Sequence, residues 1–224
     1  MTRHLQREID AMKQMLLTLC AMVEKSVVLA TRAIAEQDEK LAQTVMDGDS
    51  RIDSMEVEIE EECLKILALH QPVAVDLRAI VAVLKINNDL ERIGDLAVNV
   101  AERARFLATR PALPEPFDFS RMAGQVRAML TKAVDAFVEG RSQEAHEVCA
   151  ADDDVDGINR AMYRSVEALL GEPDADIPAL MHLLSVSRDL ERIADHATNI
   201  AEDVIYMIAG EIVRHHVEDY TKGQ

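Results

Sequence analysis

Aromatic residues are scarce in this chain. They make up 3% of its 224 positions, and tryptophan is absent. Sheets favour aromatic and β-branched side chains, whereas the alanine, leucine, methionine, glutamate and arginine that are abundant here favour helices. The composition therefore predicts an all-α protein. The length is enough to bury a real core, as one elongated domain or as two of about 110 residues each.

Positive charge is also in short supply. Lysine and arginine number 24 against 41 aspartates and glutamates, which gives a formal net charge of −17. A chain of this charge repels phosphate backbones, and the sequence contains no basic cluster that would reverse the effect. We therefore expect no direct binding to DNA or RNA.

Long apolar runs and paired cysteines are missing as well. The longest nearly apolar run, residues 15–23, is far shorter than the roughly 18 residues that suggest a membrane span. The first ten residues lack the apolar core of a signal peptide. The three cysteines, Cys20, Cys63 and Cys149, match no CxxC spacing and lie among apolar neighbours. We expect buried, reduced thiols in a cytoplasmic protein.

Signatures of catalysis are absent from the sequence too. It contains no glycine-rich phosphate loop, no G-x-S-x-G elbow and no cysteine–histidine nucleophile arrangement. Ferritin-like di-iron sites use a Glu-x-x-His pair on each of two helices, and no histidine here has a glutamate three positions before it. We therefore expect a protein that is not an enzyme.

One segment of the chain occurs twice. Residues 89–102 return 100 positions later as residues 189–202, with ten of the fourteen positions identical. Two near-copies indicate a duplicated unit, so the fold is one motif used twice. Packing alone requires only the apolar positions to recur. Here the polar positions recur best, which points to a second role.

Apolar periodicity predicts six helices, at about 4–36, 39–69, 74–108, 120–139, 143–170 and 178–210. Asp38 and Ser142 are predicted N-caps, Gly140 is a predicted C-cap, and Pro178 fits the first turn of the last helix. Residues 109–117 hold three prolines, which indicates an extended connector. The predicted fold is two tandem three-helix bundles, over residues 1–110 and 118–212, followed by a polar tail at 213–224.

The repeated polar residues share one side of their helix. Each residue turns the side chain by about 100°, so Asp95, Asn99 and Glu102 fall within about 80° of Glu91. Leu90 and Ile93, with the other apolar residues, lie on a different side. The second copy repeats this layout with Glu191, Asp195, Asn199 and Glu202. Such carboxylates repel one another unless a positive charge lies among them.

A second acidic ladder precedes each copy. In the second helix it comprises Asp49, Asp53, Glu56 and Glu60, and in the fifth helix only Asp152 and Asp156 remain, followed by Asn159 and Tyr163. Acidic pairs on two antiparallel neighbours form a concave cluster of oxygens, which selects iron, manganese, magnesium or calcium over copper. The candidate metal ligands are therefore Asp49, Asp53, Glu91, Asp95, Asn99, Glu102, Asp152, Asp156, Glu191, Asp195, Asn199 and Glu202.

A solvated acidic surface without any metal would carry the same pattern. Its carboxylates would have intrahelical partners, and Arg92 and Arg192 would then be free to pair with a neighbouring helix. A carboxylate-bridged metal enzyme or a metal store is the third alternative. His196 lies about 140° from Glu191, off the carboxylate side, so we expect it to be structural or interfacial.

Four segments together resemble the PhoU family of regulators of phosphate-specific transport. They are Asp89-Leu-Glu-Arg-Ile-Gly-Asp95, its copy Asp189-Leu-Glu-Arg-Ile-Ala-Asp195, Gln71-Pro-Val-Ala-Val-Asp-Leu-Arg78 and Val204-Ile-Tyr-Met-Ile-Ala-Gly-Glu-Ile-Val-Arg-His215. The resemblance covers essentially the whole chain. It implies two three-helix bundles related by pseudo-twofold symmetry.

The resemblance also implies sites, metals and partners. The paired E(D)xxxD motifs of the family, described as binding clusters of iron or other metals such as zinc, match Asp49/Asp53 with Glu91/Asp95. In the second repeat they match Asp152/Asp156 with Glu191/Asp195. PhoU-like proteins are cytoplasmic, often homodimeric negative regulators. They are thought to link the phosphate ABC transporter, through its ATPase PstB, to the sensor kinase PhoR, so any contact with the membrane would be indirect.

Overall fold

The protein is described by a computed structural model that places residues 3–110 and 119–213. Its helices are α1 (Arg3–Glu36), α2 (Glu39–His70), α3 (Ala74–Ala108), α4 (Phe119–Glu139), α5 (Ser142–Leu169) and α6 (Ile177–Ala209). These ranges contain no strand, so the all-α prediction is confirmed. Most of the predicted proline-rich connector and nearly all of the predicted polar tail lie outside the described residues.

Several helix ends follow the predicted chemistry. The Asp38 side chain caps α2 by accepting hydrogen bonds from the backbone N–H groups of Lys40 and Leu41, at 2.8 and 3.2 Å. Gly140 follows α4 with a φ of 65°, a backbone conformation that glycine adopts without strain. Pro178 lies in the first turn of α6, as predicted.

The predicted cap of α5 is wrong. Ser142 is the first residue of the helix, and Arg141, whose backbone is extended, occupies the capping position without a side-chain hydrogen bond to the helix backbone. The Arg141 guanidinium forms ion pairs with Glu139 and Glu144, on the two sides of the turn. The helix therefore starts one residue earlier than the serine pattern indicates.

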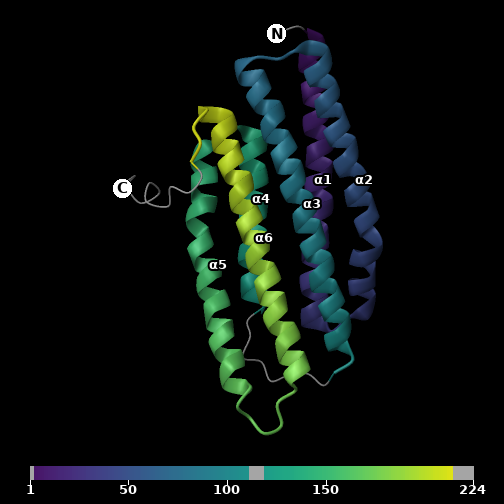
Figure 1. The fold of residues 1–224 in the computed structure, drawn as a ribbon, viewed down its shortest axis with the longest axis vertical. Coiled ribbons are helices and arrows are strands. Elements are labelled where there is room, and N and C mark those ends of the chain that lie inside the picture. The colour runs from purple at the N-terminus through teal and green to yellow at the C-terminus, as the bar shows by residue number, and fades with distance from the viewer. Residues whose placement is uncertain (1–2, 111–118, 214–224) are drawn as a thin grey trace.

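Helices α3 and α6 form the centre of the molecule (Figure 1). α1 and α2 pack on α3, α4 and α5 pack on α6, and the halves meet where α3 contacts α6 and α1 contacts α4. The side chains predicted to pack, such as Leu90 and Ile93, are fully buried. One cluster of buried apolar side chains includes residues from all six helices, so the two repeats share a core.

By length and composition alone, one helix of the described chain, His4–Glu36, is apolar enough to cross a membrane. This is α1, and its side chains Met12, Leu16 and Leu19 are completely buried in the shared core. A core helix passes the same test as a membrane span. Packing against α2, α3 and α4 is therefore enough to explain why α1 is so apolar.

The antiparallel contact of α3 with α6 is lined with polar pairs. The Lys85 ammonium lies 3.0 Å from Asp203 Oδ1, and Arg103 Nη1 lies 3.1 Å from Asp189 Oδ2. The second pair is an ion pair without hydrogen-bond alignment, because Asp189 Oδ2 has no hydrogen-bond partner. All four side chains fall at about 120–160° from the repeated glutamate of their helix. This direction is the side on which each central helix meets the other repeat.

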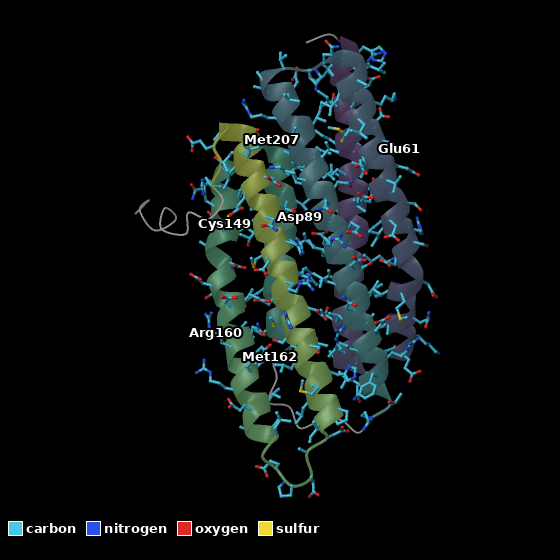
Figure 2. The ribbon with its side chains drawn as sticks, viewed as in Figure 1. Glu61, Asp89, Cys149, Arg160, Met162 and Met207 are labelled. Atoms are coloured by element: carbon cyan, nitrogen blue, oxygen red, sulfur yellow. The ribbon has the colours of Figure 1, made fainter. Side chains whose placement is uncertain are left out.

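Asp89 lies where α3 and α6 run side by side (Figure 2). Its Oδ1 lies 2.7 Å from Nδ1 of His196 and accepts a hydrogen bond of 3.3 Å from the Asn199 amide. His196 is therefore interfacial, as predicted. The position equivalent to His196 in the first repeat is Leu96, so the symmetry of the fold is not repeated in its polar contacts.

The core assignment of α3 predicts a large effect for Leu90→Ala. This change removes a fully buried side chain and leaves a cavity, so we expect it to lower the free energy of unfolding by about 2–5 kcal/mol. Urea unfolding followed by circular dichroism measures it. The matched control is Val57→Ala, because Val57 is 49% exposed. Equal costs for both changes would contradict the assignment.

The interface assignment predicts a separate effect for Asp89→Ala. The change leaves His196 and Asn199 without their shared acceptor inside the α3–α6 contact, so it should cost about 1–3 kcal/mol of unfolding free energy. Asp135→Ala, at an exposed position of α4, is the control and should change stability by less than about 0.5 kcal/mol. A neutral Asp89→Ala would show that the pair does not hold the repeats together.

Candidate functional site

Two groups of carboxylates lie on corresponding helix pairs. We call Asp49 and Asp53 of α2 with Glu91 and Asp95 of α3 the first carboxylate face. The second carboxylate face comprises Asp152 and Asp156 of α5 with Glu191 and Asp195 of α6. Within each helix the two residues are four apart, so they stand one above the other on the same side. Each face therefore joins two helices of one repeat.

Buried polar side chains fix the alignment of each helix pair. In the first repeat, the amide of the buried Asn87 donates a 2.9 Å hydrogen bond to the backbone carbonyl of Glu56. In the second repeat, the hydroxyl of the buried Ser187 donates a 2.7 Å hydrogen bond to Asn159 Oδ1. These are corresponding positions. An equivalent hydrogen bond in each repeat therefore sets the alignment that brings the two acidic pairs of that repeat opposite one another.

Close packing also brings α2 against α3 at the first face. A Cβ atom on Gly94 would lie 3.2 Å from Cγ2 of Ile52, closer than most such contacts. The corresponding residues of the second repeat are Ala194 and Val155, both completely buried. A smaller residue on one helix thus matches a larger one on the other in each repeat. Ala194 has one methyl group more than Gly94, and Val155 has one carbon fewer than Ile52. This compensation explains why the repeated segment reads Ile-Gly-Asp once and Ile-Ala-Asp once.

Two carboxylates of the first face, Asp49 and Glu91, are partly removed from water and are repelled by their acidic neighbours. Burial raises the pKa of Asp49, and the nearby charges of Asp53 and Asp95 raise it further. Burial and then Asp95 raise the pKa of Glu91, although Arg92 acts in the opposite direction. Asp49 Oδ1 is buried without a hydrogen-bond partner. An oxygen of that kind is costly unless a cation or a proton approaches it.

The second face shows the same effect more strongly. Burial raises the pKa of Asp152 to about 6, with further contributions from Asp195 and Asp156. Burial also raises the pKa values of Glu191 and Asp195, and the charge of Asp156 adds to both shifts. Asp152, Glu191 and Asp195 therefore each sense a carboxylate on the neighbouring helix. The carboxylates of this face are therefore coupled electrostatically across the α5–α6 contact.

Arginines neutralise only the outer parts of both faces. Arg92 Nε lies 3.3 Å from Glu91 Oε2, and its Nη1 lies 3.1 Å from Asp95 Oδ2. Arg160 Nη1 lies 3.0 Å from Asp156 Oδ2. Both arginines are more than half exposed and belong to the same helix as their partners. Arg92 thus pairs within its own helix rather than with a neighbouring one, and such exposed pairs contribute little stability.

The chain matches the family described as PhoU domain at residues 16–104 and again at residues 119–204. It belongs to the PhoU family. The two matches confirm the internal repeat, and each contains one complete carboxylate face. The repeat boundary between them coincides with the connection of α3 to α4.

Named relatives and solved structures cover nearly the whole chain. A phosphate-specific transport system accessory protein PhoU homolog of Aquifex aeolicus is 39% identical over 214 residues, 95% of this chain and 97% of the relative. The homolog of Pseudomonas aeruginosa is 38% identical over 220 residues, 96% and 91% of the two chains.

The architecture agrees equally well with solved PhoU structures. The crystal structure of PhoU from Pseudomonas aeruginosa superposes with a TM-score of 0.89 and 38% identity, covering 92% of this chain and 99% of that chain. The phosphate transport system regulatory protein PhoU from Streptococcus pneumoniae gives a TM-score of 0.87 and 27% identity, covering 93% and 99%. The predicted arrangement of two three-helix repeats is confirmed.

Four predicted ligands of this PhoU-family chain lie apart from the acidic pairs. The Asn199 amide is turned to Asp89 across the α3–α6 contact. Asn99 and Glu102 line a pocket of about 300 Å³ between the repeats, together with Arg103 and His182. Glu202 is half-buried further along α6. The asparagines lie about 80° from the repeated glutamates, and this offset is enough to direct them toward the interface.

Glu56, an acidic residue that was not among the predicted ligands, is coupled to the first face. Burial raises the pKa of Glu56, and the charges of Glu60 and Asp53 add to this shift. Glu56 in turn contributes to the raised pKa of Glu91, so it belongs electrostatically to the first face. Its position in the acidic ladder of α2 could have identified it from the sequence. Asn159 occupies the equivalent position in the second repeat.

Among the described residues, the carboxylates of the two faces do not form a compact group of three metal ligands. Within residues 3–110 and 119–213, the set of three histidine, cysteine or carboxylate ligand atoms that lies within 4.8 Å is formed elsewhere, by His4, Glu8 and His70. Mutual repulsion keeps like charges apart. The donor type of both faces fits a hard cation, and closing the coordination shell would need rotation of the side chains.

The raised pKa of Asp152 predicts a pH effect in this PhoU protein. Its folded pKa of about 6 exceeds the unfolded value of about 3.9. The folded state therefore holds more protons between these values, and stability falls as pH rises through them. With chelator present, Asp152→Asn should be more stable than the parent at pH 7–8 by about 1–2 kcal/mol, a figure reduced for partial exposure. Near pH 4 the difference should vanish.

Urea unfolding at pH 4, 6 and 8 measures this difference. The control is Asp154→Asn, which neutralises an exposed carboxylate two residues along α5 and should leave the pH dependence unchanged. If Asp152→Asn and the parent have parallel stability curves at all pH values, Asp152 does not carry the unfavourable charge.

Proposed function

We propose that this chain is an accessory protein of the phosphate-specific transport system that restrains phosphate uptake and the phosphate-starvation response when phosphate is plentiful. The observation that carries the proposal is the double PhoU-domain match, which spans both repeats. Relatives 38–39% identical over nearly the whole chain are named as accessory proteins of that system. The structural neighbour from Streptococcus pneumoniae is named as a regulatory protein of phosphate transport.

In this proposal the protein works in the cytoplasm as a non-enzymatic adaptor between the ATPase of the phosphate ABC transporter and a sensor kinase. Its acidic charge favours contact with proteins over contact with nucleic acid. Residues 69–75, at the end of α2 and the start of α3, offer an apolar contact surface. Leu69, Val73 and Val75 are 66%, 74% and 61% exposed. Exposed apolar side chains that cluster in this way are typical of protein contacts.

The two carboxylate faces would hold divalent or trivalent cations, with iron as the first expectation and zinc, manganese, magnesium or calcium as alternatives. Asp49, Asp53, Glu91 and Asp95 would bind on α2 and α3, and the second face would bind on α5 and α6. The buried oxygen of Asp49 without a partner and the raised pKa of Asp152 support this part of the proposal. A bound cation would offset the repulsion and fasten the two helices of each face together.

Deleting the gene tests the regulatory role. Expression from a phosphate-starvation promoter should rise in phosphate-rich medium, and a copy of the wild-type gene should restore repression. Unchanged reporter expression would overturn the proposal. Iron-dependent oxidase or hydrolase turnover by the purified protein would instead support the alternative of a carboxylate-bridged metal enzyme.

Glu91→Gln combined with Asp95→Asn tests the first carboxylate face. Both side chains lie off the core, so the helices should remain intact, while metal bound after purification without chelator should fall by roughly half because the second face is preserved. Repression should be restored only weakly by this variant. Circular dichroism, elemental analysis and the reporter measure the three effects.

The matched control for this variant is Glu58→Gln with Glu61→Gln, which removes two exposed charges from another side of α2. It should bind metal and repress the reporter like the wild type. If Glu91→Gln with Asp95→Asn unfolds the protein with or without metal, the assignment of these residues to a site is wrong. Full metal content in that variant would have the same meaning.

A further inference from the structure

A histidine–carboxylate cluster lies at the end of the molecule where α1 begins and α2 ends (Figure 1). His4 and Glu8 stand one turn apart on α1, and His70 is the last residue of α2. Their ligand atoms, one from each residue, all lie within 4.8 Å of one another. The three residues come from two helices that pack against each other. None of them belongs to a carboxylate face.

One distance in this cluster matches the separation of two ligands on a tetrahedral metal ion. His4 Nδ1 lies 3.4 Å from Glu8 Oε1. Two ligands bound to zinc at about 2.0–2.1 Å with tetrahedral angles are separated by about 3.3–3.4 Å. His70 Nε2 lies 2.5 Å from Glu8 Oε2, a hydrogen-bond distance that is shorter than two ligands of one ion allow. Binding an ion would therefore replace this hydrogen bond and move the two groups apart. The centroids of the His4 and His70 imidazole rings are 5.6 Å apart, and the rings are tilted relative to each other.

The surroundings of the cluster favour a firmly held but accessible ion. Glu8 and His70 are mostly buried, whereas the His4 side chain is 75% exposed. An ion can therefore enter beside His4, and water can fill the fourth position. Lys65 interacts electrostatically with Glu8 but is already paired with Glu62 at 2.9 Å. Two imidazoles and one carboxylate form a donor set that suits zinc better than magnesium or calcium.

We propose that His4, Glu8 and His70 bind one zinc-class divalent ion, which fastens the start of α1 to the end of α2. This histidine-containing site differs in chemistry from the oxygen-only carboxylate faces at the middle of the helices. It links the first turn of the chain to the helix whose end leads into the exposed apolar connection of residues 69–75. The proposal does not depend on the function proposed above.

Cobalt(II) binding to the full chain, purified without an affinity tag, tests the site. Tetrahedral cobalt gives visible d–d absorption, and zinc should abolish it by competition. We expect one equivalent of cobalt with this absorption. His4→Gln and His70→Gln should each weaken binding by at least about tenfold, because each removes one of three protein ligands. Zinc should raise the melting temperature of the parent but not of His70→Gln.

Two controls separate this site from other metal-binding groups. His146→Gln removes a histidine in the other repeat and should bind cobalt like the parent. A variant with Asp49→Asn, Asp95→Asn, Asp152→Asn and Asp195→Asn should lose any binding at the carboxylate faces but keep the visible cobalt spectrum. Circular dichroism of each metal-free variant shows that it is folded. Parent-like cobalt binding by both His4→Gln and His70→Gln, or no tetrahedral cobalt spectrum in the parent, would overturn the proposal.

Discussion

The contact between α3 and α6 is the constraint on which the rest of the structure depends. Each of these helices must bury one side against its own bundle and another side against the other repeat. Long apolar stripes alone would allow the two helices to slide past each other. The pairs Lys85–Asp203, Asp89–His196 and Arg103–Asp189 set their relative position, because a shift of one turn would leave charged groups buried without partners.

The carboxylate faces follow from this arrangement. The apolar side of α3 packs against α1 and α2, and another side contacts α6. The acidic residues remain at the edge of the α2–α3 contact. Asn87 and Ser187 then align the neighbouring helices, and the acidic pairs come opposite one another. Burial, with the repulsion of neighbouring carboxylates added to it, raises the pKa values of Asp49 and Asp152. Such partly buried, mutually repelling carboxylates lower the stability of the folded state, and groups of this kind are common at functional sites.

The two repeats share a backbone plan but differ in chemistry. The first face includes Glu56, whereas the second has Asn159 at that place, and Asp152 has the larger pKa shift. Cations bound at the two faces would therefore meet different numbers of carboxylates. The polar contacts between repeats are also unequal, because His196 has Leu96 as its counterpart. Pseudo-twofold symmetry thus describes the helices better than the sites.

Much of this protein was predictable from local patterns. Apolar periodicity located all six helices, because each repeats its buried positions over many turns, and the recurrence of residues 89–102 revealed the duplication. Capping was predicted less well: Asp38 caps α2 as expected, but α5 starts at Ser142 itself, with Arg141 in the capping position. The acidic ladders were visible because residues four apart share a side of any helix.

What each polar side chain faces was decided only by tertiary structure. The sequence determined that Asp89 and Asp189 recur, but not that they are buried between the repeats, since that depends on how α3 crosses α6. It placed Asn199 near the acidic residues by angle, yet Asp89 of the other repeat draws the amide away from them. His4, Glu8 and His70 show the same limit. Sixty-two residues separate Glu8 from His70, and only the antiparallel packing of α1 and α2 brings them together.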